Sequence, residues 1–205
     1  MQYKLEYQYS VTIKDIEDSL YVEKLKRYLG CILDKIQKGD RIKIIIDSEG
    51  GNINYMKDIK DILNDIYDKG ALMDFYCQKV KSAAFILLIL LKNEGKIDNV
   101  YAYPYTMFMW HKPTFCIQFE GKQTSQDTFT MIGDLESLIN QTNDLKSSLE
   151  KTHQEYILWE EIYKNLLIDH YKSLIDEEIE KDMNLSSGLA KVRGIVDGVL
   201  GHRTL

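Results

Sequence analysis

Two turns that follow apolar stretches carry residues suited to nucleophilic catalysis. One apolar stretch leads into Gly51, and Ser82 lies between a second stretch and a long apolar run. A serine hydroxyl that attacks a carbonyl group needs N–H groups that stabilise the oxyanion formed. The N–H groups of Gly51 and Ala83 come from these two turns. If both turns follow parallel strands, they meet at the edge of the sheet where sites of open α/β folds gather.

Each of these residues also has a purely structural interpretation. A glycine after a strand can simply supply the positive φ of a tight turn, and a serine before a helix is a common N-cap. His111 follows another apolar stretch and is the best-placed candidate base, whereas the other three histidines fall in charged or terminal segments. No pair of histidines has the spacing of a metal site. We expect no metal and no other cofactor.

Alternating strand and helix patterns place these turns in a fold. Short apolar stretches alternate with stretches of helical periodicity, and this order predicts a parallel sheet covered by helices. The run from Ala83 to Leu91 is apolar on every side, which predicts a fully buried helix. The predicted strands are residues 3–11, 41–46, 71–77, 99–102, 105–110 and 115–119, the last followed by a turn at residues 120–122. The predicted helices are residues 19–38, 55–66, 82–92 and 186–193.

The chain changes character after residue 119. From Thr124 to about Ile179, apolar residues keep a helical spacing within highly charged sequence. One unbroken helix of that length would be roughly 80 Å long, so we expect a break or an arm that projects from the core. The predicted domains are an α/β head, residues 1–119 and 181–205, and a helical handle, residues 120–180, that is used for oligomerisation.

Composition and charge exclude several classes of function. The 205 residues are 44% hydrophobic and 28% charged, which is typical of a soluble globular protein. The 26 basic and 32 acidic residues give a net charge of -6, so we expect no nucleic-acid or membrane partner. The longest apolar run is shorter than the about 20 residues that span a bilayer. Three widely spaced cysteines and no visible secretion signal predict a cytoplasmic protein.

Three separated segments, residues 44–53, 77–91 and 102–113, match one known family in order and spacing. They resemble the proteolytic subunit of the Clp protease, a family of serine peptidases with the Clp/crotonase fold. Residues 44–53 are similar to the strand and Ser-Pro-Gly-Gly turn of the family. Residues 77–91 are similar to its nucleophile strand and buried helix, and residues 102–113 are similar to its Met-Ile-His-Gln-Pro stretch.

This resemblance implies a complete catalytic triad. Asp182 would not be selected from its own surroundings, but residues 181–197 resemble the Arg-Asp stretch of the family and the helix that follows it. The implied roles are those of nucleophile, general base and orienting carboxylate. The implied residues are Ser82, His111 and Asp182 for the triad, and Gly51 and Ala83 for the oxyanion hole.

The chain also departs from the family beside the proposed nucleophile. Glu49 stands in place of the proline of the turn, and Lys81 and Val80 stand where small residues usually precede the serine. A carboxylate near the oxyanion hole would oppose the developing negative charge unless it points to solvent. A Ser82–Lys81 dyad is not expected, because neighbouring side chains at a helix start point apart.

These observations lead to one main functional hypothesis and two alternatives. The first is a serine endopeptidase of the Clp type. The resemblance implies cleavage of unfolded polypeptides or peptides inside a homo-oligomeric chamber of sevenfold rings, served by an AAA+ unfoldase. The second is a catalytically silent homologue that acts as a structural or assembly subunit, which Glu49 and the long arm motivate. A crotonase-like acyl-CoA enzyme is the third, but it would not explain Ser82, His111 and Asp182 together.

Overall fold

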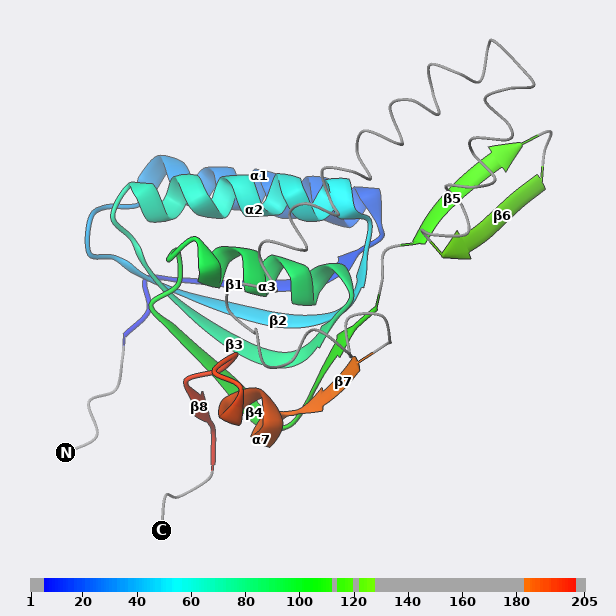
Figure 1. Ribbon diagram of the computed structural model, residues 1–205. Coiled ribbons are helices and arrows are strands. Elements are labelled where there is room, and N and C mark those ends of the chain that lie inside the picture. The colour runs from blue at the N-terminus through cyan, green and yellow to red at the C-terminus, as the bar shows by residue number, and fades with distance from the viewer. Residues whose placement is uncertain (1–5, 112–113, 120–121, 128–182, 202–205) are drawn as a thin grey trace. The chain divides into compact units, whose positions relative to one another are not determined.

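The computed structural model describes residues 6–111, 114–119, 122–127 and 183–201. The chain divides into two compact units. Residues 1–110 and 183–205 form the first unit, and residues 111–182 form the second. The first unit holds a central sheet with helices packed on it (Figure 1).

The described part of the first unit is built on a six-stranded, mostly parallel sheet. Strands β1, β2, β3 and β4 lie side by side in this order and run parallel. Strand β7 pairs antiparallel with β4, and the short β8 runs parallel to it. The predicted α/β class with a mostly parallel sheet is confirmed. The strands are β1 Tyr9–Ile16, β2 Arg41–Gly51, β3 Leu72–Lys81, β4 Asn99–Trp110, β7 Met183–Ser186 and β8 Gly198–Val199.

Helices α1, α2 and α3 lie on the same face of this sheet (Figure 1). Every second residue of β2, namely Ile42, Ile44 and Ile46, is fully buried, as expected for a strand covered on that face. The residues from Ala83 to Leu91 are all buried, which confirms the predicted buried helix. The helices are α1 Ser19–Lys35, α2 Ile53–Asp68, α3 Ala83–Asn93 and α7 Ser187–Val192.

Side-chain caps fix where two of these helices begin. The Asp18 carboxylate accepts a hydrogen bond from the Leu20 N–H at the start of α1, at 2.9 Å. The Asn52 side chain accepts one from the Asn54 N–H at the start of α2, at 2.8 Å. Each cap satisfies an N–H group that has no partner within the helix. Helix α2 therefore starts directly after the Gly50–Gly51 turn.

Strand β4 is continuous, although the sequence predicts two strands separated by Pro104. The pairing of β4 with β3 stops after Ala102 and resumes at Met107, so Pro104 lies at an irregularity of the ladder. A proline lacks the N–H that a ladder requires, and it is tolerated there because the ladder is interrupted at that point. The Thr106 hydroxyl donates to the Cys77 carbonyl within this gap and so satisfies a backbone group of β3.

The first strand extends further along the chain than predicted. The sequence predicts a strand over residues 3–11, of which residues 3–5 lie outside the described residues, and β1 is Tyr9–Ile16. Its pairing with β2 places Val11 beside Ile44 and Ile13 beside Ile46. Burial of these residues, rather than the aromatic content of the first residues, therefore determines the register.

The second unit contains a hairpin, of which the sequence predicts the first strand, residues 115–119, but not the second. Strand β5, Thr114–Phe119, pairs antiparallel with β6, Lys122–Asp127. The prediction of helix from Thr124 is therefore wrong as far as Asp127. The polar sequence of β6 lacks the apolar alternation that indicates a strand. The rest of the predicted handle, residues 128–180, lies outside the described residues.

Candidate active site

Ser82 occupies the sharp turn between β3 and α3. Its φ is 51° and its ψ is -125°, and among the described residues it is the only non-glycine residue with positive φ. Such a conformation costs about 1–3 kcal/mol and is held only by its surroundings. A strained serine between a strand and a helix is the geometry that exposes the hydroxyl of a nucleophile elbow.

The alternative role of Ser82 as an N-cap is not realised. Ser82 stands at the N-cap position of α3, but its side chain makes no capping hydrogen bond. The residue is half-buried at the turn. Its N–H donates to the Met109 carbonyl at 2.9 Å, which fixes the turn to β4. The backbone of Ser82 is therefore fixed by this hydrogen bond, and its hydroxyl does not cap α3.

Gly50 lies directly against this turn. A Cβ at residue 50 would be 2.5 Å from the Ser82 Cβ and 2.8 Å from the Lys81 carbonyl oxygen. The φ of Gly50 is 107°, in the region that favours glycine. Both findings require glycine at this position. The sequence predicts a close approach at the Gly-Gly pair but singles out only Gly51, whereas the contact with Ser82 is made at Gly50.

The two predicted oxyanion donors lie on adjacent turns. Ala83 is the first residue of α3, whose first N–H groups have no partner within the helix. The Ala83 nitrogen lies 3.1 Å from the place that a Gly50 Cβ would occupy, so the missing side chain leaves this N–H uncovered on that side. Gly51 has a φ of 136°, and a Cβ there would be 2.4 Å from the Glu17 nitrogen. The Gly50–Gly51 turn is thus held between β1 and the Ser82 turn.

Glu49 does not carry an uncompensated charge toward the site. Its side chain is 64% exposed, and its two carboxylate oxygens lie 2.8 Å from the Lys79 Nζ and 2.8 Å from the Lys81 Nζ. Hydrogen bonds from Lys79 and Lys81 lower the pKa of Glu49. The negative charge of Glu49, which the sequence places beside the proposed oxyanion hole, is therefore compensated by these two lysines. The Lys81 ammonium is thus engaged by Glu49.

The structure brings Gly50 against Ser82 and Ala83 in the first unit, and the next residue, Gly51, lies against Ile16 and Glu17. The assignment of Gly51 as an oxyanion donor therefore stays a prediction. His111 directly follows Trp110, the last residue of β4, and is the first residue of the second unit. Asp182 lies outside the described residues. The assignment of His111 and Asp182 to the triad therefore stays a prediction.

The described residues contain neither a metal-binding cluster nor a membrane-crossing helix. No group of three or more histidine, cysteine, aspartate or glutamate side chains in this part of the chain could hold a metal ion. Within the same residues, no helix is both long enough and apolar enough to cross a membrane.

Fold and site together define a mixed α/β protein with a strained serine elbow at the carboxyl edge of a parallel sheet. The family model described as Clp protease matches residues 11–203, and the chain belongs to that family. Two of the solved structures that match this chain illustrate the shared fold. ClpP1 from Listeria monocytogenes, as a single-substitution variant, has a TM-score of 0.62 at 18% identity, with 96% of this chain and 92% of that chain covered.

The other structure is ClpP1 from Listeria monocytogenes without that substitution. It has a TM-score of 0.55 at 16% identity, with 95% of this chain and 92% of that chain covered. No curated protein sequence is a significant match to this chain. At these identities the structures show the fold alone, and the family model shows a peptidase family.

Proposed function

We propose that this chain is a serine endopeptidase of the Clp type. The observation that carries the proposal is the backbone of Ser82, with φ 51° and ψ -125° between β3 and the buried α3. Strained non-glycine residues cluster at functional sites, and a sharp strand-to-helix turn is how a nucleophile elbow exposes its serine hydroxyl. Membership of the Clp protease family supports the same activity.

In the proposed reaction the Ser82 Oγ attacks the carbonyl carbon of a peptide bond. His111 accepts the hydroxyl proton and then donates it to the leaving amine, and Asp182 orients the imidazole. The N–H groups of Gly51 and Ala83 stabilise the oxyanion of the tetrahedral intermediate. A water molecule, deprotonated by His111, then hydrolyses the acyl-enzyme and restores Ser82. The peptide cleavage itself uses no cofactor.

The proposed assembly is a homo-oligomeric chamber, with unfolded polypeptides or peptides as substrates and an AAA+ unfoldase as a partner. The support for it is the family match and the apolar stripe predicted in residues 131–175. A cytoplasmic location is proposed with it, and the unpaired Cys31 and Cys77 are compatible with reduced thiols. Sedimentation velocity at micromolar concentration tests the assembly, because a clean monomer near 24.0 kDa contradicts it.

A fluorophosphonate probe tests the catalytic proposal. The full-length protein should gain the mass of one adduct, and peptide mapping should place the adduct on Ser82. Ser82→Ala should lose both labelling and peptide hydrolysis, because only oxyanion stabilisation and binding then remain. A folded wild-type protein that stays unlabelled would support a silent scaffold instead. The ion pairs of Glu49 remove one of the two reasons for that alternative.

A further inference from the structure

Glu49 and two lysines form a charged cluster on the two strands that lead into the proposed active site. Glu49 lies near the end of β2, and Lys79 and Lys81 lie at the end of β3. The pairing of Asp47 with Lys79 and of Ser48 with Val80 places Glu49 beside Lys81. One carboxylate therefore holds both lysines, at 2.8 Å each, directly before Ser82. In the same register, Met109 of β4 lies beside Lys81 on the other side.

The Ser82 turn needs support from its neighbours because its own backbone conformation is unfavourable. The described contacts come from two directions. The Met109 carbonyl accepts the Ser82 N–H at 2.9 Å. On the other side, Gly50 lies so close that a Cβ would be 2.5 Å from the Ser82 Cβ. A small shift of Gly50 would therefore leave the Ser82 turn unsupported on that side.

The segment Ser48–Glu49–Gly50 is itself held at two points. The Ser48 hydroxyl is buried and accepts a hydrogen bond from the Gly50 N–H at 3.1 Å, which sets the local turn. The Glu49 carboxylate then ties this turn to β3 through Lys79 and Lys81. Because Gly50 follows Glu49 and Ser82 follows Lys81, the Glu49–Lys81 ion pair joins the two residues that precede the closest contact.

We propose that Glu49 is a positioning residue that, through Lys79 and Lys81, holds Gly50 against Ser82 and so fixes the nucleophile and the Ala83 N–H. This proposal rests on the proposed peptidase function. It explains why Glu49 and Lys81 occur together in this chain, because the opposite charge of each compensates that of the other. Glu49 acts through the backbone and does not contact the reacting atoms.

The rate of fluorophosphonate labelling at Ser82 tests the proposal in the full-length protein. Glu49→Gln keeps the size of the side chain and removes its charge, and should slow labelling by about two- to tenfold, the range expected from losing two exposed ion pairs. Raising the salt concentration should slow the wild type and leave Glu49→Gln unchanged. A charge-reversed triple variant, Glu49→Lys with Lys79→Glu and Lys81→Glu, should recover most of the rate.

The matched control is Asp58→Asn in α2. It removes the carboxylate that lies 2.8 Å from the Nζ of Lys26 in α1. It also breaks an exposed ion pair, but it lies away from the Ser82 turn and should leave the labelling rate unchanged. Equal rates for the wild type and Glu49→Gln would overturn the proposal. So would a triple variant that folds but labels no faster than Glu49→Gln.

Hydrogen exchange of the peptide that covers residues 79–86 separates this proposal from the peptidase proposal. Glu49→Gln should speed exchange there, including that of the Ser82 N–H, and Asp58→Asn should not. If wild-type Ser82 is not labelled at all, the peptidase proposal fails, and the exchange result still decides whether Glu49 holds the turn. Unchanged exchange in Glu49→Gln would overturn the positioning role.

Discussion

Gly50 lies against Ser82 so closely that a Cβ at residue 50 would be only 2.5 Å from the Ser82 Cβ. The same Cβ would be 2.8 Å from the Lys81 carbonyl oxygen, which belongs to the backbone and cannot move aside cheaply. Two turns that are about 30 residues apart in the sequence thus form one rigid unit. The strained serine and its support have to be considered together.

Gly50→Ala should therefore damage the site more than the stability of the sheet as a whole. The substitution combines a clash with the Ser82 turn and a φ of 107°, and we expect a loss of about 2–4 kcal/mol with labelling of Ser82 abolished. Urea unfolding and fluorophosphonate labelling measure the two effects.

Gly30→Ala in α1 is the matched control, because a Cβ there meets nothing within 4 Å. It should stabilise the protein by about 1 kcal/mol. Normal labelling in Gly50→Ala would contradict the close packing.

The strain at Ser82 makes a second prediction about stability. Glycine adopts positive φ without the steric cost that a Cβ causes, whereas alanine keeps that cost. Ser82→Gly and Ser82→Ala should both lose peptidase activity, but Ser82→Gly should be the more stable of the two by about 1 kcal/mol. Thermal or urea unfolding compares them directly. Equal stabilities, or a more stable alanine variant, would show that the serine is not strained.

The position of β1 at the end of the sheet makes a third prediction. The Tyr21 hydroxyl donates to the Thr12 carbonyl of this strand at 2.7 Å and accepts from the Lys14 N–H at 2.9 Å. Tyr21→Phe should lower the free energy of unfolding by about 1 kcal/mol and expose an edge to other chains. Tyr28→Phe is the control, since its bond to the Ser10 carbonyl is long, at 3.4 Å. Chemical unfolding compares the two variants, and a loss as large in Tyr28→Phe would contradict a specific role of Tyr21.

The sequence was sufficient for features that depend on local periodicity. The order of β1, α1, β2, α2, β3, α3 and β4, the buried helix after Ser82 and the glycine turn after β2 all follow from apolar spacing within short windows. The strand ends were less predictable, because β2 and β3 extend beyond their apolar residues to Gly51 and Lys81. Their last residues are paired through the backbone, which no side-chain pattern reports.

Features that depend on register between strands could not be predicted. The Glu49–Lys81 ion pair joins residues on β2 and β3, and it exists because the ladder shifts between Ile46 and Asp47. From the sequence alone, the same two residues are separate obstacles to catalysis. Asp182 was selected through the resemblance alone, because a lone aspartate before a helix carries no signal of its role. The strand β6 was missed because its polar residues do not alternate with apolar ones.

Asp74 is a fully buried residue of β3, and its carboxylate contributes to the raised pKa of Tyr7. The Asp74 carboxylate accepts hydrogen bonds from Arg41 at 2.6 Å, Asn99 at 2.7 Å and the Tyr7 hydroxyl at 3.0 Å. The Tyr7 hydroxyl also lies 2.8 Å from that of Tyr76. Burial, the hydrogen bonds with Tyr76 and Asp74 and the Asp74 charge raise the pKa of Tyr7. A phenolate at Tyr7 would face the Asp74 carboxylate without a proton between them.

The last prediction concerns alkaline pH. Because the folded state raises the pKa of Tyr7, it holds the phenol proton more tightly than the unfolded state does, where the pKa is about 10. This contribution to stability is complete below about pH 10 and is lost as the pH rises beyond that value. Tyr7→Phe should therefore be less stable than the wild type at pH 8, by about 1 kcal/mol, and should lose less stability between pH 9 and pH 11.

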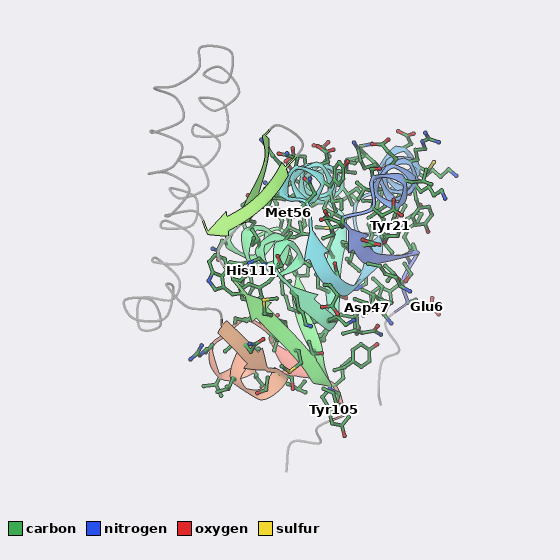
Figure 2. All side chains as sticks on the ribbon, turned by 90° about the vertical axis from the view of Figure 1, so that its right-hand side faces the viewer. Glu6, Tyr21, Asp47, Met56, Tyr105 and His111 are labelled. Carbon is green, nitrogen blue, oxygen red and sulfur yellow. The ribbon has the colours of Figure 1, made fainter. Side chains whose placement is uncertain are left out.

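Urea unfolding across this pH range measures the difference, and Tyr105→Phe is its matched control. Tyr105 is 94% exposed and projects from β4 away from the body of the first unit (Figure 2). Its hydroxyl is solvated in the folded and the unfolded state alike, so this variant should follow the wild-type curve. Tyr21 and Tyr101 also have raised pKa values, both mainly through burial, and they should leave part of the alkaline loss in Tyr7→Phe. If Tyr7→Phe loses as much stability as the wild type above pH 10, the Tyr7–Asp74 hydrogen bond does not control the alkaline limit.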